Sequence, residues 1–285
     1  MKSFSIIVCL LATAYADDGQ LPSSHMEHAF SHAGRAIITL SIEHTFPANG
    51  RALGLDISEN PSGPETSVCG VNNVDGKVYF YNAYSGTPAG SIDLSPSNTS
   101  CFGAVFCTGG PWDEYIYTND WGSNDLFYSS NWGTTWSNVF DPSFTSGRGM
   151  DYDGDHFWTT NGSGSIIRFY PEYSPFDTFS VPETSGQLSG LTVFPYEGDL
   201  AVAVTSYGAE GIWFYIFDGT DLEYMGFGQF PITAYNSYGL AHSNNLNGIF
   251  WSYEETPGNR QISRLSFEIS QSFHQSTWGG VKSAF

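Results

Sequence analysis

Short runs of aromatic and β-branched residues alternate along this chain with clusters of Gly, Asn, Asp and Pro. Runs of this kind, bounded by such clusters, are typical of β-strands joined by tight turns. Clear examples are Tyr115–Asp120 (YIYTND), His156–Gly164 (HFWTTNGSG), Leu200–Gly208 (LAVAVTSYG) and Ile249–Tyr253 (IFWSY). No long amphipathic helix pattern is found after the first 16 residues. The pattern therefore predicts an all-β protein.

Five of the turns share one form, in which a strand end is followed by Pro, a polar stretch and Gly. The Pro-to-Gly offset is seven or eight residues, and successive glycines are 49, 46, 41 and 49 residues apart. A period of 40 to 50 residues that holds four short strands indicates a β-propeller blade. The prolines are Pro47, Pro96, Pro142, Pro182 and Pro231, and the glycines are Gly54, Gly103, Gly149, Gly190 and Gly239.

The glycines suit the first strand of each blade, because glycine lets backbones approach closely around a crowded channel. The last repeat supplies only three clear strands, up to Ile269, while Gly34–Pro47 (GRAIITLSIEHTFP) ends with the same Pro-to-Gly signature. We therefore predict that this N-terminal strand completes the last blade and closes a ring of five four-stranded blades. Six blades are the alternative, if the segments before Arg35 and after Ile269 build another sheet.

The stretch Ser129–Trp136 (SSNWGTTW) falls between the third and fourth strands of the second predicted blade. It resembles the Asp-box of sialidase-like (BNR-type) propellers, S-x-D-x-G-x-T-W, with Asn131 in place of the aspartate. The resemblance implies a structural turn rather than an activity. Sialidase chemistry needs an arginine cluster, and only Arg51 and Arg148 fall on the loops expected at the channel mouth. The segment Phe157–Pro171 (FWTTNGSGSIIRFYP) also resembles lactonase-like and streptogramin-lyase-like propellers, at the level of fold.

The N-terminus reads as a signal peptide. Lys2 is followed by the apolar run Phe4–Leu11 and by small residues up to Ala16. This order of basic, apolar and small residues is that of a secretory signal, and the apolar run is too short to span a bilayer. We expect a secreted or cell-surface protein after cleavage near Ala16. The expected organisation is a signal peptide (1–16), a linker (17–34), the propeller (35–273) and a C-terminal tail (274–285).

The net charge limits the class of partner, and the cysteine count leaves the disulfide pairing open. The formal net charge is −20 and Lys and Arg together number nine. So few cations cannot form a phosphate-binding stripe, so we expect no nucleic-acid partner. A carbohydrate or an extracellular protein remains the expected partner. Cys69 could form a disulfide with Cys101 or Cys107, or all three could be buried free thiols.

The predicted channel mouth is the expected place for a ligand. The crossings between blades share one face of a propeller with the loops between second and third strands, and loops on a rigid scaffold often carry binding residues. Amides, carboxylates and aromatic rings there suit stacking and hydrogen bonding to a sugar, although good turn formers would give the same composition. The candidate ligand-binding residues are Arg51, Asn73, Asn119, Asp120, Trp121, Arg148, Asn161, Tyr207, Tyr238, Tyr253, Glu254 and Glu255.

A non-catalytic binding module is therefore the leading hypothesis. The alternatives are a glycosidase or lyase that uses mouth carboxylates such as Asp120, Glu254 and Glu255, and a structural surface or matrix component. Glycoside hydrolysis would need two acids about 5 to 10 Å apart, which linear spacing does not show.

We expect no cofactor, with one exception left open. The alternating carboxylates of Asp151, Asp153 and Asp155 could hold a Ca²⁺ ion. The same segment aligns with the Tyr196–Asp199 hairpin of the next repeat, and Asp-Gly is a strong hairpin signal, so a turn is the favoured interpretation.

Overall fold

The regular elements of the chain are almost all β-strands. The computed structural model describes residues 34–58, 66–140, 147–170 and 173–272, in which one short 3₁₀ turn, η1 (Gly110–Trp112), accompanies 20 strands. The predicted all-β fold is confirmed. The predicted signal peptide, the linker up to residue 33 and the C-terminal tail lie outside the described residues. No helix in the described ranges is long and apolar enough to cross a membrane.

Four blades are formed by strands consecutive in sequence, and neighbouring strands in each are antiparallel. Blade 1 contains β2 (Leu55–Ser58), β3 (Ser67–Asn72), β4 (Lys77–Asn82) and β5 (Pro88–Asp93). Blade 2 contains β6 (Cys101–Phe106), β7 (Ile116–Asp120), β8 (Leu126–Ser129) and β9 (Ser137–Phe140). Blade 3 contains β10 (Met150–Tyr152), β11 (Phe157–Thr160), β12 (Ser165–Tyr170) and β13 (Tyr173–Ser180). Blade 4 contains β14 (Leu188–Tyr196), β15 (Asp199–Ser206), β16 (Gly211–Phe217) and β17 (Leu222–Gln229).

The fifth blade joins the two ends of the described chain. Its strand order is β18–β19–β20–β1, so the N-terminal strand is the outermost one. The strand β1 also runs parallel to β17 of blade 4, with Ile38 opposite Gly228 and Thr39 opposite Gln229. The predicted closure of a five-bladed propeller by the N-terminal strand is thereby confirmed. The bounds are β18 (Asn236–Ser243), β19 (Gly248–Thr256), β20 (Asn259–Ser272) and β1 (Gly34–Pro47).

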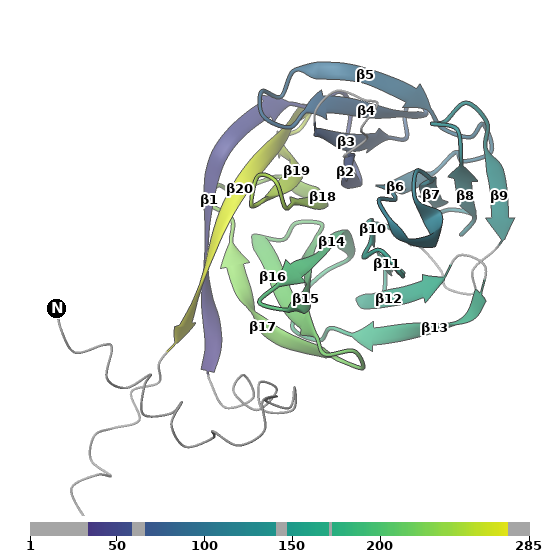
Figure 1. The fold of residues 1–285 in the computed structure, drawn as a ribbon. Coiled ribbons are helices and arrows are strands. Elements are labelled where there is room, and N and C mark those ends of the chain that lie inside the picture. Colours follow the sequence, from purple (N-terminus) through teal and green to yellow (C-terminus); the bar gives the residue numbers. More distant parts are fainter. Residues whose placement is uncertain (1–33, 59–65, 141–146, 171–172, 273–285) are drawn as a thin grey trace, which may run out of the picture. The chain divides into compact units, whose positions relative to one another are not determined.

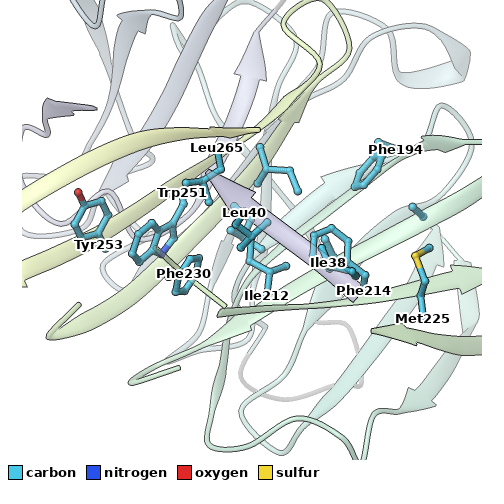
Figure 2. Close-up of a cluster of buried hydrophobic side chains, with 14 residues drawn as sticks. Ile38, Leu40, Phe194, Ile212, Phe214, Met225, Phe230, Trp251, Tyr253 and Leu265 are labelled. Carbon is cyan, nitrogen blue, oxygen red and sulfur yellow. The ribbon is translucent and has the colours of Figure 1, made fainter. Parts of the chain in front are cut away.

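The alternation of side chains in β1 explains its place. Ile38 and Leu40 are buried, whereas Thr39 and Ser41 between and after them are exposed. Figure 2 shows Ile38 and Leu40 among the apolar side chains of blades 4 and 5, such as Phe214. One face of β1 thus packs against apolar side chains of both blade 4 and blade 5, and the strand covers the edges of both blades.

The five repeat glycines form a closed ring of contacts. A Cβ atom on any of them would lie within 2.7 Å of a backbone atom in the innermost segment of the next blade. Each blade thus contacts the next one, from blade 1 to blade 5, and blade 5 contacts blade 1. Figure 1 shows β2, β6, β10, β14 and β18 facing one another around the centre. The close approach predicted for Gly54, Gly103, Gly149, Gly190 and Gly239 is confirmed.

Two aspartates, each two residues after a repeat glycine, join neighbouring blades. The Asp56 carboxylate accepts the N–H of Phe106 in the next blade. The Asp151 carboxylate of blade 3 accepts the N–H of Val193 in blade 4 at 2.7 Å. Charge-assisted bonds of this kind are stronger than those between neutral groups, so they fix the register between blades.

The turn at Ser129–Trp136 lies between β8 and β9, as predicted. The Asn131 side chain accepts the N–H of Thr135 at 2.9 Å, and its amide donates to the Thr135 hydroxyl at 2.8 Å. The Trp136 indole N–H donates to the carbonyl of Asp93 in blade 1 at 2.9 Å. Asn131 thus holds the turn, and Trp136 ties it to the neighbouring blade.

Candidate functional site

β-bulges set the direction of the side chains at one end of the innermost strands. The register of β6 shifts between Cys101 and Ala104, and that of β18 shifts between Ser237 and Leu240. A bulge adds a residue and re-aims its side chain. The residues concerned, Phe102 and Tyr238, each stand directly before a repeat glycine.

These side chains meet others from every blade. We call the group formed by Leu53, Phe102, Arg148, Tyr207 and Tyr238 the axial cluster; its members come from blades 1, 2, 3, 4 and 5 in that order. Residues from five different blades can gather only around the central axis. The Tyr207 ring packs edge-on against Phe102 and Tyr238, with ring centroids 6.2 and 5.6 Å away. The axial cluster therefore lies at the central axis, at the face that carries the blade crossings.

Arg148 is the cation of this cluster and is only 8% exposed. The centre of its guanidinium lies 5.7 Å from the Phe102 ring and 5.4 Å from the Tyr207 ring. Its terminal nitrogens donate to the Leu188 carbonyl at 3.2 Å and to the Gln187 side-chain oxygen at 2.9 Å. Burial lowers the pKa of Arg148, because the charged form is poorly solvated there.

Glu254 is held by several donors beside the axial cluster. One of its oxygens accepts from the Tyr238 hydroxyl at 3.0 Å and from Asn236, and the other accepts the N–H of Gly258 at 2.6 Å. Burial by itself raises the pKa of Glu254, but these bonds together with Arg260 lower it below its usual value. Burial and the bond to Glu254 raise the pKa of Tyr238 to about 12. The carboxylate is therefore ionised and engaged at both oxygens.

The side chains of Asn119 and Asp120 form hydrogen bonds with backbone groups near the axial cluster. Asn119 accepts the N–H of Gly103 and donates to the Arg148 carbonyl, both at 2.7 Å. The Asp120 carboxylate accepts the backbone N–H groups of Ser100, Gly122 and Ser123 at 2.8 to 2.9 Å. Asn119 thus connects blades 2 and 3, and Asp120 fixes the loop that presents Trp121.

The remaining candidates lie on the rim. Trp121 is 43% exposed, and two further large apolar side chains on the same face, Val74 and Tyr235, are 73% and 59% exposed. The side chain of Asn161 accepts the N–H of Ser165 and closes a turn. Arg51 and Glu255 are exposed, Asn73 is partly buried, and Glu255 accepts from Asn259. The rim thus combines polar residues that form turns with exposed apolar side chains.

Tyr253 does not belong to this face. It is 2% exposed within β19 and lies in a core cluster, where its ring stacks on Trp251 at 4.0 Å. Its hydroxyl lies 3.2 Å from that of Ser263. The sequence placed Tyr253 beside Glu254 on a loop, but β19 continues to Thr256 and Tyr253 points inward. Its expected role at the mouth is replaced by a role in packing.

The three aspartates proposed for Ca²⁺ point to different partners. Asp151 accepts from Thr192 and Val193 of blade 4, and burial raises its pKa to about 6. Asp153 accepts the indole N–H of Trp158 at 2.7 Å, and Asp155 contacts Tyr170. Among the described residues, no three acidic, His or Cys side chains form a group that could hold a metal ion. The carboxylates serve the turn and the contact between blades 3 and 4.

The cysteines form no disulfide in the described part of the chain. Cys69, Cys101 and Cys107 are free and buried. Burial raises the pKa of each thiol well above its usual value. A thiol that stays protonated is a poor nucleophile, so these residues serve as small core side chains. The bridge that the sequence left open is not formed.

Two members of the axial cluster, Leu53 and Phe102, escaped the sequence analysis. Both are apolar and both directly precede a repeat glycine, as Arg148 and Tyr238 do. Alignment of the repeats at their glycines would have shown this shared position. The bulges at Phe102 and Tyr238 have no signal of their own in the residue types.

The comparisons with known proteins support the fold. The sequence matches no family model and no curated protein sequence. Glutaminyl cyclase from Myxococcus xanthus is similar in structure, with a TM-score of 0.57 at 13% identity over 82% of this chain and 99% of that one. A PQQ-bound aldose sugar dehydrogenase from Streptomyces coelicolor gives a TM-score of 0.52 at 12% identity, again over 82% and 99%. At these identities the similarity shows a shared propeller fold and nothing about activity.

Proposed function

We propose that this protein is a secreted or cell-surface propeller that works as a non-catalytic binding module, with a carbohydrate ligand on the face of the axial cluster. The observation that carries the proposal is the combination on this face of a fixed polar and aromatic centre with the exposed ring of Trp121. Aromatic faces stack on sugar rings, and fixed polar groups orient the ligand. The expected export rests on residues 1–16 alone.

The hydrogen bonding of the acids favours binding over hydrolysis. A glycosidase needs one carboxylate free to attack or activate water and another free to donate a proton. Both oxygens of Glu254 are occupied by donors, and Asp120 accepts three backbone N–H groups. These bonds hold both carboxylates in place and occupy the oxygens that would otherwise face a substrate or an attacking water. An enzyme remains the alternative, to be tested by a screen of substrates if binding fails.

A glycan-array screen of the mature protein, with and without Ca²⁺, tests the proposal. We expect specific binding that does not require Ca²⁺ and that falls about fivefold in the Trp121→Ala variant. A single stacked aromatic ring contributes about 1 kcal/mol, which corresponds to this loss.

Tyr84→Ala is the matched control, because Tyr84 is also an exposed aromatic residue, at 53%, but lies in the turn between β4 and β5. That variant should bind as the wild type does. A blank array, or equal losses in both variants, would contradict a carbohydrate site on this face, and a blank array would favour an extracellular protein as the partner.

A further inference from the structure

Arg148 is a buried cation without an acidic partner among the described residues. The ion pairs of this part of the chain that involve Lys or Arg join Lys77 to Asp93, Arg168 to Asp177 and Arg260 to Glu254. Removal of a charge from water without a counter-charge is costly. The cost is notable in a chain with a formal net charge of −20, in which acids are plentiful.

The guanidinium also keeps unused hydrogen-bonding capacity. Among the described residues, only two of its five N–H groups have hydrogen-bond acceptors, and both acceptors are neutral oxygens of blade 4. Its Nε atom is buried and has no hydrogen-bond partner among the described residues. The same holds for the hydroxyl of Thr160, whose carbonyl accepts the N–H of Arg148. Buried polar atoms are rarely left unpaired, so unpaired atoms in adjoining residues call for an explanation.

The guanidinium is fixed in position rather than free to search for a partner. The Phe102 and Tyr207 rings both lie within 6 Å of it, and the Gln187 and Leu188 oxygens hold its terminal nitrogens. Burial raises the pKa of Tyr207, and the charges of Arg148 and of Arg51, which is exposed on the crossing into blade 1, lower it. Two cations thus act on one tyrosine in an otherwise acidic molecule.

We propose that the axial cluster is an anion-binding site in which Arg148 takes the carboxylate of an acidic sugar residue. This inference rests on the proposed function and specifies the chemistry of its ligand. A carboxylate is planar and matches the fork of a guanidinium, which binds it through parallel N–H donors. The aromatic side chains beside Arg148 suit the apolar face of a sugar ring.

A singly charged ligand fits better than a phosphate. The site offers one buried guanidinium with some donors already in use and one exposed arginine nearby, whereas a dianion would meet the field of the acidic protein. The test therefore compares glucuronate with glucose, which has the same ring without the carboxylate, and with inorganic phosphate.

Isothermal titration calorimetry on the wild-type protein is expected to give glucuronate at least tenfold tighter binding than glucose, with phosphate weaker than glucuronate. The Arg148→Gln variant should lose at least tenfold in glucuronate affinity and keep its weak affinity for glucose. Arg148→Lys should fall between the two, because it keeps the charge but loses the fork. Arg168→Gln is the matched control; Arg168 belongs to the same blade but pairs with Asp177 at the exposed side of β12 and β13.

Equal binding of glucuronate and glucose by the wild type, or no binding of glucuronate at all, would overturn the inference even if the Arg148→Gln variant failed to fold. Phosphate binding tighter than glucuronate would also overturn it. If the array shows binding of neutral glycans that depends on Trp121 and not on Arg148, the proposed function stands and the anion site fails. If glucuronate binds through Arg148 while the array stays blank, the anion site stands for the free sugar acid and the proposed recognition of glycan chains fails.

Discussion

The Gly149→Val variant should lose about 3 to 5 kcal/mol of unfolding free energy, or fail to fold. A Cβ atom at this position would lie 2.6 Å from the Leu191 nitrogen and 2.8 Å from the Ser189 oxygen. Both are backbone atoms of the next blade, so no side-chain rotation relieves the contact, and blades 3 and 4 must separate. Chemical denaturation of the purified mature protein measures the loss.

Gly122→Val is the matched control for this substitution. Its Cβ would meet only side-chain atoms, 3.1 Å from the Ser100 hydroxyl and 3.2 Å from the Asp120 carboxylate, on an exposed loop. We expect a loss of about 1 kcal/mol or less. Equal stabilities of the two valine variants would contradict the close approach of blades 3 and 4.

The Leu40→Asp variant should be destabilised by about 3 kcal/mol or more, because it places a charge in an apolar core. Leu40 is 6% exposed and packs with Ile38 in the cluster shared by blades 4 and 5. Figure 2 shows its side chain among those of Phe230, Trp251 and Leu265. Loss of β1 from this position would open two blades at once, so thermal unfolding should occur at a markedly lower temperature.

Ser41→Asp provides the control, since Ser41 is the next residue of the same strand and is exposed. Its melting temperature should stay close to that of the wild type. A stable, monomeric Leu40→Asp protein would show that β1 is not needed to close the ring.

Much of the fold could be predicted because it follows from repeated local signals. Gly54 and its four equivalents recur for a steric reason, and a steric requirement leaves the same residue type at every copy. The strand Gly34–Pro47 could be assigned to the last blade because that blade otherwise lacked a strand and the Pro47–Gly54 signature matched the other crossings. Both inferences concern backbone geometry, which glycine and proline control directly.

The candidate site was less predictable, because it depends on where individual side chains point. Tyr253 and Trp121 look alike in sequence, yet Tyr253 ends in the core and Trp121 on the surface. Tyr253 lies within β19, which continues to Thr256, whereas Trp121 follows directly after the last residue of β7. Phe102 gained its place in the axial cluster from a bulge, and Glu254 was bound by partners up to 18 residues away. Residue types alone do not encode these details.

The most direct test of the account is to locate the bound ligand on the protein. Hydrogen–deuterium exchange of the wild type, free and saturated with the glycan that binds best on the array, would do so. We expect slower exchange in the loop between β15 and β16, which carries Tyr207, and in the loop between β7 and β8, which carries Trp121. Slower exchange confined to the outer strands such as β5, with both loops unchanged, would contradict a binding site at the axial cluster.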